Sequence, residues 1–214
     1  MIARYVIGAR MKAMRGDRDA AARVLNDGAR AAATLSLPRL TAHVENERMR
    51  LALPLADGPT RVRHEEALLG DGLREITAQL RDETEIRGLL AAQPDLACRR
   101  AQAWVQRLQH QGRPRALLQA NRLLVVCLSA AGRIDEAKQT LTSLAAQCAE
   151  LGLVRYLLDD GPDLIAALAA LRDDLHGDQW NPTWPQVPSA FLDRIVSEAH
   201  LVSSGGAGPP ARPD

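Results

Sequence analysis

The sequence is poor in aromatic residues, which make up 3% of its 214 residues, although 46% of the residues are hydrophobic. Sandwiches and barrels of β-strands normally rely on aromatic and β-branched side chains, so this composition disfavours them. An apolar content supplied mainly by alanine and leucine is typical of closely packed helices. No segment alternates polar and apolar residues over the length of a strand, so we expect an all-α fold.

The chain also lacks an excess of charge of either sign, with 27 basic and 26 acidic residues and a formal net charge of +1. This balance gives no electrostatic attraction to nucleic acid or to an anionic membrane. No run approaches the ~20 apolar residues of a membrane span. Arg4, Arg10 and Lys12 interrupt the N-terminal segment, which therefore does not resemble a signal peptide. We expect a soluble, cytoplasmic protein that does not itself bind nucleic acid or a membrane.

Residues that carry chemistry are few. The three cysteines, Cys98, Cys127 and Cys148, are odd in number and far apart, which disfavours a disulfide framework or a zinc site. We expect them to be buried as small hydrophobic residues in a reducing cytosol. No histidine pair has the spacing of a zinc-binding helix, and no serine stands in a glycine-flanked nucleophile turn. The sequence therefore predicts no enzyme activity, no metal site and no cofactor.

What the sequence does contain is a corner between two helices, read from Gly132 to Ala137. Gly132 can adopt the left-handed conformation that ends a helix. Asp135 and Glu136 would then occupy the first turn of the next helix, where negative charge suits the helix dipole. Ala137 is small where two helices must approach closely. The segment 16–21 repeats this pattern, which is the helix-turn-helix pattern of tetratricopeptide-type repeats.

Helical spacing, proline and glycine define the predicted organisation. The two clear corners are not separated by a whole number of ~34-residue units, so we expect an irregular tetratricopeptide-like solenoid of antiparallel helix pairs. Two tryptophans, Trp180 and Trp184, lie in a proline-rich loop and either pack over the last helices or form a contact surface. The predicted segments are a helical solenoid over 1–175 with a break near 54–60, an irregular loop over 176–188, a helix over 189–202 and a disordered tail over 203–214.

Two short segments together resemble a known family. The first is the run from Ala131 to Ala137, and the second is Val-Arg-Tyr-Leu-Leu-Asp-Asp-Gly, from Val154 to Gly161. They are similar to the tetratricopeptide-type sensor region of MalT-like regulators, the large ATP-dependent members of the LuxR family. The resemblance implies an effector-binding solenoid in a transcriptional regulator. The family's phosphate loop does not occur in this sequence, and the chain stops where the family continues into its DNA-binding helix-turn-helix.

Solenoids generally bind along the concave surface lined by the first helix of each pair. If the helix over 119–131 has that position, Leu124 and Leu128 face the core and Arg122 faces the groove. Its planar guanidinium suits a carboxylate, a phosphate or sugar hydroxyls, so we expect Arg122→Ala to weaken binding and to leave the fold intact. The predicted ligand-binding residues are Arg10, Gln119, Arg122, Val126 and Ser129.

Two functions remain open from the sequence. The chain could be a sensor segment that binds a small inducer or a peptide or protein partner and relays occupancy to domains outside it. It could instead be a free-standing protein–protein interaction adaptor. An oligomer is compatible with either function, and neither the ligand nor the pathway can be derived from these residues.

Overall fold

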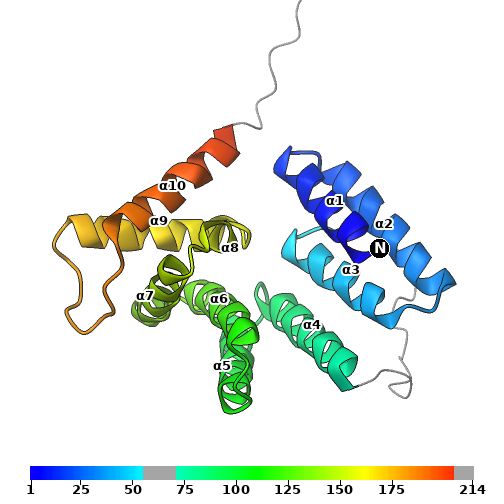
Figure 1. Cartoon of the computed structure of the whole chain (residues 1–214), viewed down its shortest axis with the longest axis horizontal. Coiled ribbons are helices and arrows are strands. Elements are labelled where there is room, and N and C mark those ends of the chain that lie inside the picture. Colours follow the sequence, from blue (N-terminus) through cyan, green and yellow to red (C-terminus); the bar gives the residue numbers. More distant parts are fainter. Residues whose placement is uncertain (55–70, 205–214) are drawn as a thin grey trace, which may run out of the picture. The chain divides into compact units, whose positions relative to one another are not determined.

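The computed structural model describes residues 1–54 and 71–204, and in these ranges the chain is helical and contains no strand. Figure 1 shows the helices in chain order. The all-α prediction is confirmed. The helices are α1 (Ile2–Met14), α2 (Arg18–Thr34), α3 (Pro38–Arg50), α4 (Asp71–Leu89), α5 (Pro94–His110), α6 (Pro114–Ala130), α7 (Ile134–Glu150), α8 (Val154–Leu158), α9 (Pro162–His176) and α10 (Ser189–Ser204).

Most helix boundaries agree with the sequence prediction because glycine and proline define them. Prolines open α3, α5, α6 and α9, where the missing N–H has no intrahelical partner to lose. The C-terminal helix continues to Ser204, two residues past its predicted end. Residues 61–69 of the predicted solenoid, most of the predicted break near 54–60 and the predicted tail from 205 lie outside the described residues.

The predicted corner at Gly132 is present. Gly132 has a φ of 71°, and the N–H of Arg133 donates to the carbonyl of Leu128 at 2.9 Å, which is the six-to-one bond that closes a helix end. Gly112 and Gly152 also have positive φ, and the three glycines stand at equal intervals along the chain. Each interval holds one helix and its corner, so a helix pair takes more than the ~34 residues of a tetratricopeptide unit. The helix pairs in this part of unit 2 are therefore longer than a tetratricopeptide unit, as a departure from the consensus repeat predicts.

The chain divides into two compact units, of which unit 1 holds the described residues from Met1 to Glu85 and unit 2 holds Ile86–Ser203. The boundary falls inside α4, later than the break that the sequence predicted near 54–60. In unit 1, α2 packs against both α1 and α3. At Gly28 on α2, an added Cβ would lie 2.9 Å from the Tyr5 ring and 3.0 Å from Val44, so only glycine allows this approach. The core of the three helices includes Ala9, Ala21, Leu25, Leu40 and Val44.

Unit 2 is built around α6. This helix packs against α5, α7 and α9, and α9 also packs against α7 and α8 (Figure 1). Successive packing of neighbouring helices is the arrangement of a solenoid. Because α6 is covered on several sides, every residue from Arg122 to Leu128 is buried. Trp104 on α5 is 2% exposed and belongs to this core, as its place among the apolar residues of that helix indicates.

The loop between α9 and α10 is irregular, as predicted, and it begins one residue later, at Gly177. Trp180 and Trp184 are both half-buried and pack against the core of unit 2. Their rings meet edge to face, with centroids 5.6 Å apart and an interplanar angle of 83°. Of the two roles that the sequence left open for these tryptophans, packing over the last helices is the one observed.

Candidate functional site

A groove of about 380 Å³ lies in unit 2, where the C-terminal end of α6, the first turn of α7 and the first half of α9 meet. Most of its lining comes from alanines, because small side chains leave space between helices that pack closely. Ile134 lies at its edge and is 50% exposed. The remaining lining residues are Ser129, Ala130, Ala137, Lys138, Asp163, Ala166, Ala167 and Ala170.

Three polar side chains enter this apolar lining. Within the described residues, the Ser129 hydroxyl makes no hydrogen bond and the Asp163 carboxylate makes no ion pair. Lys138 is held in place, because its Nζ lies 2.5 Å from Oδ2 of Asp174 in a largely buried ion pair. A mostly apolar groove with a free hydroxyl and a free carboxylate is typical of a binding site for a small molecule or a peptide side chain.

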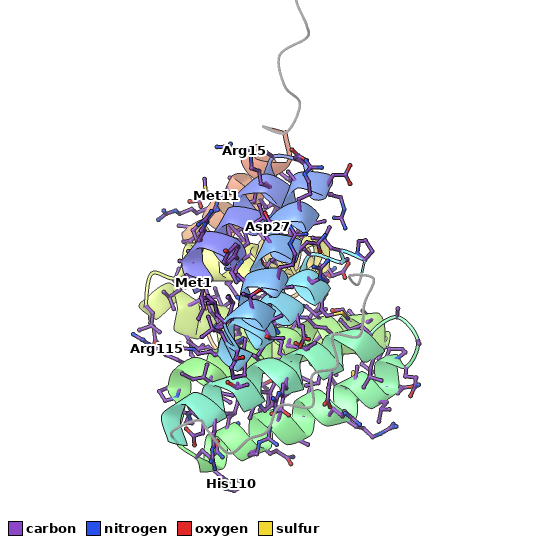
Figure 2. The ribbon with its side chains drawn as sticks, turned by 90° about the vertical axis from the view of Figure 1, so that its right-hand side faces the viewer. Met1, Met11, Arg15, Asp27, His110 and Arg115 are labelled. Atoms are coloured by element: carbon purple, nitrogen blue, oxygen red, sulfur yellow. The ribbon has the colours of Figure 1, made fainter. Side chains whose placement is uncertain are left out.

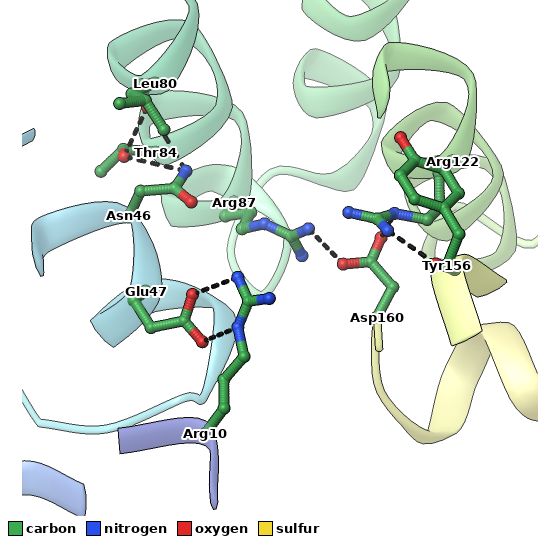
Figure 3. Close-up of polar contacts among 9 residues, drawn as sticks. All are labelled: Arg10, Asn46, Glu47, Leu80, Thr84, Arg87, Arg122, Tyr156 and Asp160. Atoms are coloured by element: carbon green, nitrogen blue, oxygen red, sulfur yellow. Dashed lines mark hydrogen bonds and ion pairs between the residues drawn. The ribbon is translucent and has the colours of Figure 1, made fainter. Parts of the chain in front are cut away.

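A second polar feature of unit 2, a buried ion cluster around Asp160, is structural. The Asp160 carboxylate is fully buried and lies 2.6 Å from Nη2 of Arg87 and 2.9 Å from Nε of Arg122 (Figure 3). The second contact is an ion pair without the alignment of a hydrogen bond. Arg122 also donates from Nη1 to the Tyr156 carbonyl at 2.7 Å, and its guanidinium lies 4.3 Å from the centre of the Tyr156 ring. The cluster links α4, α6 and the end of α8.

Unit 1 has its own ion pair. Nε and Nη2 of Arg10 donate to the two carboxylate oxygens of Glu47, both at 2.7 Å (Figure 3). The Glu47 side chain is 2% exposed and that of Arg10 is 33% exposed. A bidentate pair of this kind compensates the burial of the carboxylate. The contact connects α1 to α3 and explains why a glutamate is tolerated inside unit 1.

The structure distributes the five predicted ligand-binding residues over different environments. Ser129 lines the groove. Gln119 is half-buried on α6 and does not line it. Val126 is 5% exposed, so its predicted position on an open concave surface is wrong. Arg10 binds Glu47 in the other unit. Ligand contact by these residues stays a prediction, and the groove supports it for Ser129.

The expectation that Arg122 occupies a surface position is also wrong. Arg122 is 4% exposed and its guanidinium contacts Asp160 and Tyr156. The prediction assumed that only one face of α6 is buried, whereas three neighbouring helices cover it. The unbroken apolar run from Leu123 to Leu128 was the signal for this, because a helix that is apolar all round is a buried helix. An arginine inside such a helix requires a buried acidic partner.

The sequence analysis identified neither Arg87 nor Asp160 as a site residue. The structure shows that the Asp160 carboxylate contacts both Arg87 and Arg122. Nothing in the local pattern around Arg87 indicates burial. Two sequence features could have suggested the cluster. One is the single arginine, Arg122, beside the apolar run of α6, and the other is the pair of consecutive aspartates, Asp159 and Asp160.

The cysteines have the environment that the sequence predicted. Cys98, Cys127 and Cys148 are buried free thiols. Burial raises the pKa of Cys127 to about 12 and that of Cys148 to about 11, chiefly because the thiolate would lose its hydration. Both thiols are therefore protonated near neutral pH, and burial also raises the pKa of Cys98. The three residues act as small apolar core residues.

Comparison with known proteins finds relatives among mycobacterial kinases. Proteins named serine/threonine-protein kinase PknK, from two strains of Mycobacterium tuberculosis and one of Mycobacterium bovis, are each 42% identical to the chain over 166 residues. The match covers 75% of the chain, whereas the chain spans only 15% of the length of these relatives. No protein-family model matches the chain. No solved structure matches it either.

Two features are absent from the residues that the structure describes. None of their helices has both the length and the apolar content that a membrane crossing requires. No three histidine, cysteine, aspartate or glutamate side chains come together in a geometry that could hold a metal ion within the part of the chain that the structure describes.

Proposed function

We propose that this chain is a non-catalytic sensor and interaction segment, built from helical repeats, that belongs to a regulatory protein. The observation that carries the proposal is the groove between α6, α7 and α9, which combines an apolar lining with the free polar groups of Ser129 and Asp163. Its volume of about 380 Å³ falls within the usual range of small-molecule sites. The resemblance to the sensor region of MalT-like LuxR-family transcriptional regulators supports the same function.

The relationship to the kinases fits a segment outside a catalytic domain. Protein kinases carry a glycine-rich phosphate loop, a His-Arg-Asp catalytic loop and an Asp-Phe-Gly motif, and this sequence contains none of the three. Kinase catalysis also uses a lysine on a strand, and the described part of the chain is helical. We therefore assign the shared segment to the regulatory part of these relatives. In this proposal the chain contains no catalytic residue and needs no cofactor.

The groove suggests how occupancy is relayed. Ser129 belongs to α6 and Asp163 to the first turn of α9, and both line the same groove. A ligand that contacts both would favour one separation of the two helices over others, because it binds that arrangement more tightly. The change in the separation of α6 and α9 would then be transmitted along α9 to the residues that follow it. The proposal places this event in the cytoplasm, which is where three free thiols are expected to persist.

The chemistry of the lining indicates the ligand class. Five alanines favour a compact apolar body, while the Ser129 hydroxyl and the Asp163 carboxylate favour a hydroxyl or amine on it. The exposed side chain of Ile134 extends the apolar surface beyond the groove. That extension supports the alternative function, in which the chain is an adaptor and the groove accepts a peptide side chain from a protein partner.

The test is a thermal-shift screen with small hydroxylated or amine compounds and short peptides, followed by calorimetry on any ligand found. Ala166→Trp fills the groove from an exposed position on α9 and is expected to weaken binding at least tenfold. Gln147→Trp adds the same side chain at an exposed position of α7 outside the groove and is expected to leave affinity unchanged. Ser129→Ala is expected to lower affinity about threefold to tenfold, because one hydrogen bond contributes about 0.5–1.5 kcal/mol.

Equal affinity for the wild type and Ala166→Trp would remove the groove from the proposal. A screen that yields peptides and no small molecule would favour the adaptor. A screen that yields neither would contradict the sensor function.

A further inference from the structure

The outer face of α1 in unit 1 carries a stripe of exposed apolar side chains. Ile7, Met11 and Met14 are 51%, 50% and 43% exposed. They are spaced by four and then three residues, which places them one above the other on a single face of the helix. Val6 and Ala9, which are buried, belong to the opposite face that packs into the unit. Solvent exposure of three large apolar side chains in a row marks an interaction surface.

The stripe is bordered by positive charge. Residues 1–16 contain no acidic residue and four basic ones: Arg4, Arg10, Lys12 and Arg15. Arg10 is engaged by Glu47. Arg4, Lys12 and Arg15 are exposed, and none of them forms an ion pair with any residue that the structure describes. Helical geometry places Arg4 and Arg15 beside the stripe and Lys12 further round the same side. Figure 2 shows Met11 and Arg15 along α1.

From this arrangement we propose that the outer face of α1 docks an amphipathic helix of a protein partner whose apolar stripe is bordered by carboxylates. The four-three spacing of Ile7, Met11 and Met14 is that of a helix–helix seam. Methionine side chains adapt to a partner's shape, and they are frequent on surfaces that bind helices. Acidic borders on the partner would pair with Arg4 and Arg15, which would supply orientation and specificity.

Two other occupants fit the surface less well. In a second copy of the chain, α1 packed against α1 would bring two sets of unpaired cations together, and this repulsion opposes association. An anionic membrane would require a broader apolar face than one seam, together with the large aromatic or leucine side chains of interfacial helices. The stripe has neither, because it is one seam of an isoleucine and two methionines and because Val6 and Ala9 on the opposite face of α1 are buried in unit 1. The surface lies in unit 1 and does not depend on the groove in unit 2.

The experiment uses the full chain and a designed probe. The probe is a helical peptide with leucine at the seam positions and glutamate at the flanking positions, and its control has lysine at the same flanking positions. We expect fluorescence anisotropy to show at least tenfold tighter binding of the glutamate peptide, with a difference that shrinks as salt is added. Met11→Glu and the double variant Arg4→Glu/Arg15→Glu are each expected to weaken binding at least tenfold.

Matched controls change the same properties elsewhere. Leu151→Glu alters an apolar side chain that is 62% exposed in unit 2, and Arg115→Glu reverses an exposed charge there (Figure 2). Both are expected to leave binding unchanged, and far-UV circular dichroism verifies that all variants are folded. Hydrogen exchange with the peptide bound is expected to show new protection in α1.

Three results would overturn the proposal. The first is equal binding, or no binding, of the two peptides. The second is self-association of the chain that Met11→Glu abolishes, which would identify a second copy as the occupant. The third is sedimentation of the chain with phosphatidylglycerol-containing vesicles that Arg4→Glu/Arg15→Glu abolishes, which would identify a membrane.

Discussion

The helices α1 and α6 belong to different units and differ in how completely they are covered. Around α6 pack α5, α7 and α9, and every residue from Arg122 to Leu128 is buried. In unit 1, α1 packs against α2 and α3 and exposes Ile7, Met11 and Met14. Both helices have apolar residues for a core, but α6 buries an unbroken run of them, whereas the buried residues of α1 are Val6 and Ala9. The number of neighbouring helices, rather than composition, decides which apolar residues stabilise the fold and which remain available for binding.

Arginines show the same difference. Arg122 on α6 is buried and requires the buried Asp160 carboxylate as its partner. On α1, Arg4 and Arg15 stay in solvent, where they need no partner. An arginine therefore has a structural role where it contacts a buried carboxylate, as Arg122 does, whereas Arg4 and Arg15 remain available for recognition.

Removing the carboxylate of the buried cluster is expected to have the largest effect. Asp160→Ala removes the buried carboxylate that Arg87 and Arg122 both contact and should destabilise unit 2 by about 3–5 kcal/mol. All three tryptophans lie in unit 2, so urea unfolding followed by tryptophan fluorescence reports on that unit. An Asp160→Ala midpoint equal to that of the wild type would mean that the cluster contributes no stability.

Matched truncations compare the two helices directly. Leu123→Ala on α6 removes a side chain that is 0% exposed and should destabilise unit 2 by about 2–5 kcal/mol. Met11→Ala on α1 removes one that is 50% exposed and should change stability by no more than about 0.5 kcal/mol. Circular dichroism during urea unfolding measures both. A Met11→Ala cost that approaches that of Leu123→Ala would show that α1 is covered in solution.

Substitutions at one helix corner of each unit are expected to change stability in opposite directions. Gly132 has a φ of 71°, and an added Cβ would meet no atom within 4 Å, so Gly132→Ala should destabilise unit 2 by about 1–2 kcal/mol through backbone strain alone. Ser36 has a φ of 51° without being glycine, so Ser36→Gly should relieve strain and raise stability slightly. Urea unfolding of both variants gives the two signs. A stabilising Gly132→Ala would contradict the positive φ.

The smallest expected effect is the pH dependence that His43 gives to the stability of unit 1. Burial, and then the positive charge of Arg39, lower the pKa of His43 below its usual value of 6.5. The unfolded chain then binds a proton more readily than the folded chain, so the stability contributed by His43 is present above pH 6.5 and is lost as pH falls through the lowered pKa. His43→Gln should remove this component. The measurement is the urea midpoint of the wild type minus that of His43→Gln, taken at pH 7.5 and at pH 5.5. We expect this difference to be smaller at pH 5.5, and the same value at both pH values would contradict the lowered pKa of His43.

Much of the fold follows from local sequence, because glycine, proline and helical spacing act within one or two turns. The ends of α6 and α7, the burial of Trp104 and the irregular loop before α10 were all predictable for that reason. The family resemblance and the sensor function stay predictions, and the structure adds a groove that fits them.

The candidate site was less predictable because it depends on which helices meet. Asp160 and Arg122 are distant in sequence and meet only through the packing of α6 with the segments that follow it. Of the five predicted groove residues, Ser129 lines the observed groove, because it lies near the end of α6 where coverage by neighbouring helices stops. The boundary of the two units inside α4 also has no local signal, since the helix runs through it.

Native-state hydrogen exchange, resolved to single helices, tests the difference between the two helices most directly. We expect the amides of α6 from Leu118 to Leu128 to exchange slowest, through unfolding of unit 2 as a whole, because this helix is enclosed. Asp160→Ala should accelerate them. The amides of α1 should exchange faster and should not respond to Asp160→Ala, because α1 belongs to the other unit. Exchange of α6 as fast as that of α1, or equal acceleration of both helices by Asp160→Ala, would contradict the contrast between an enclosed helix and an edge helix.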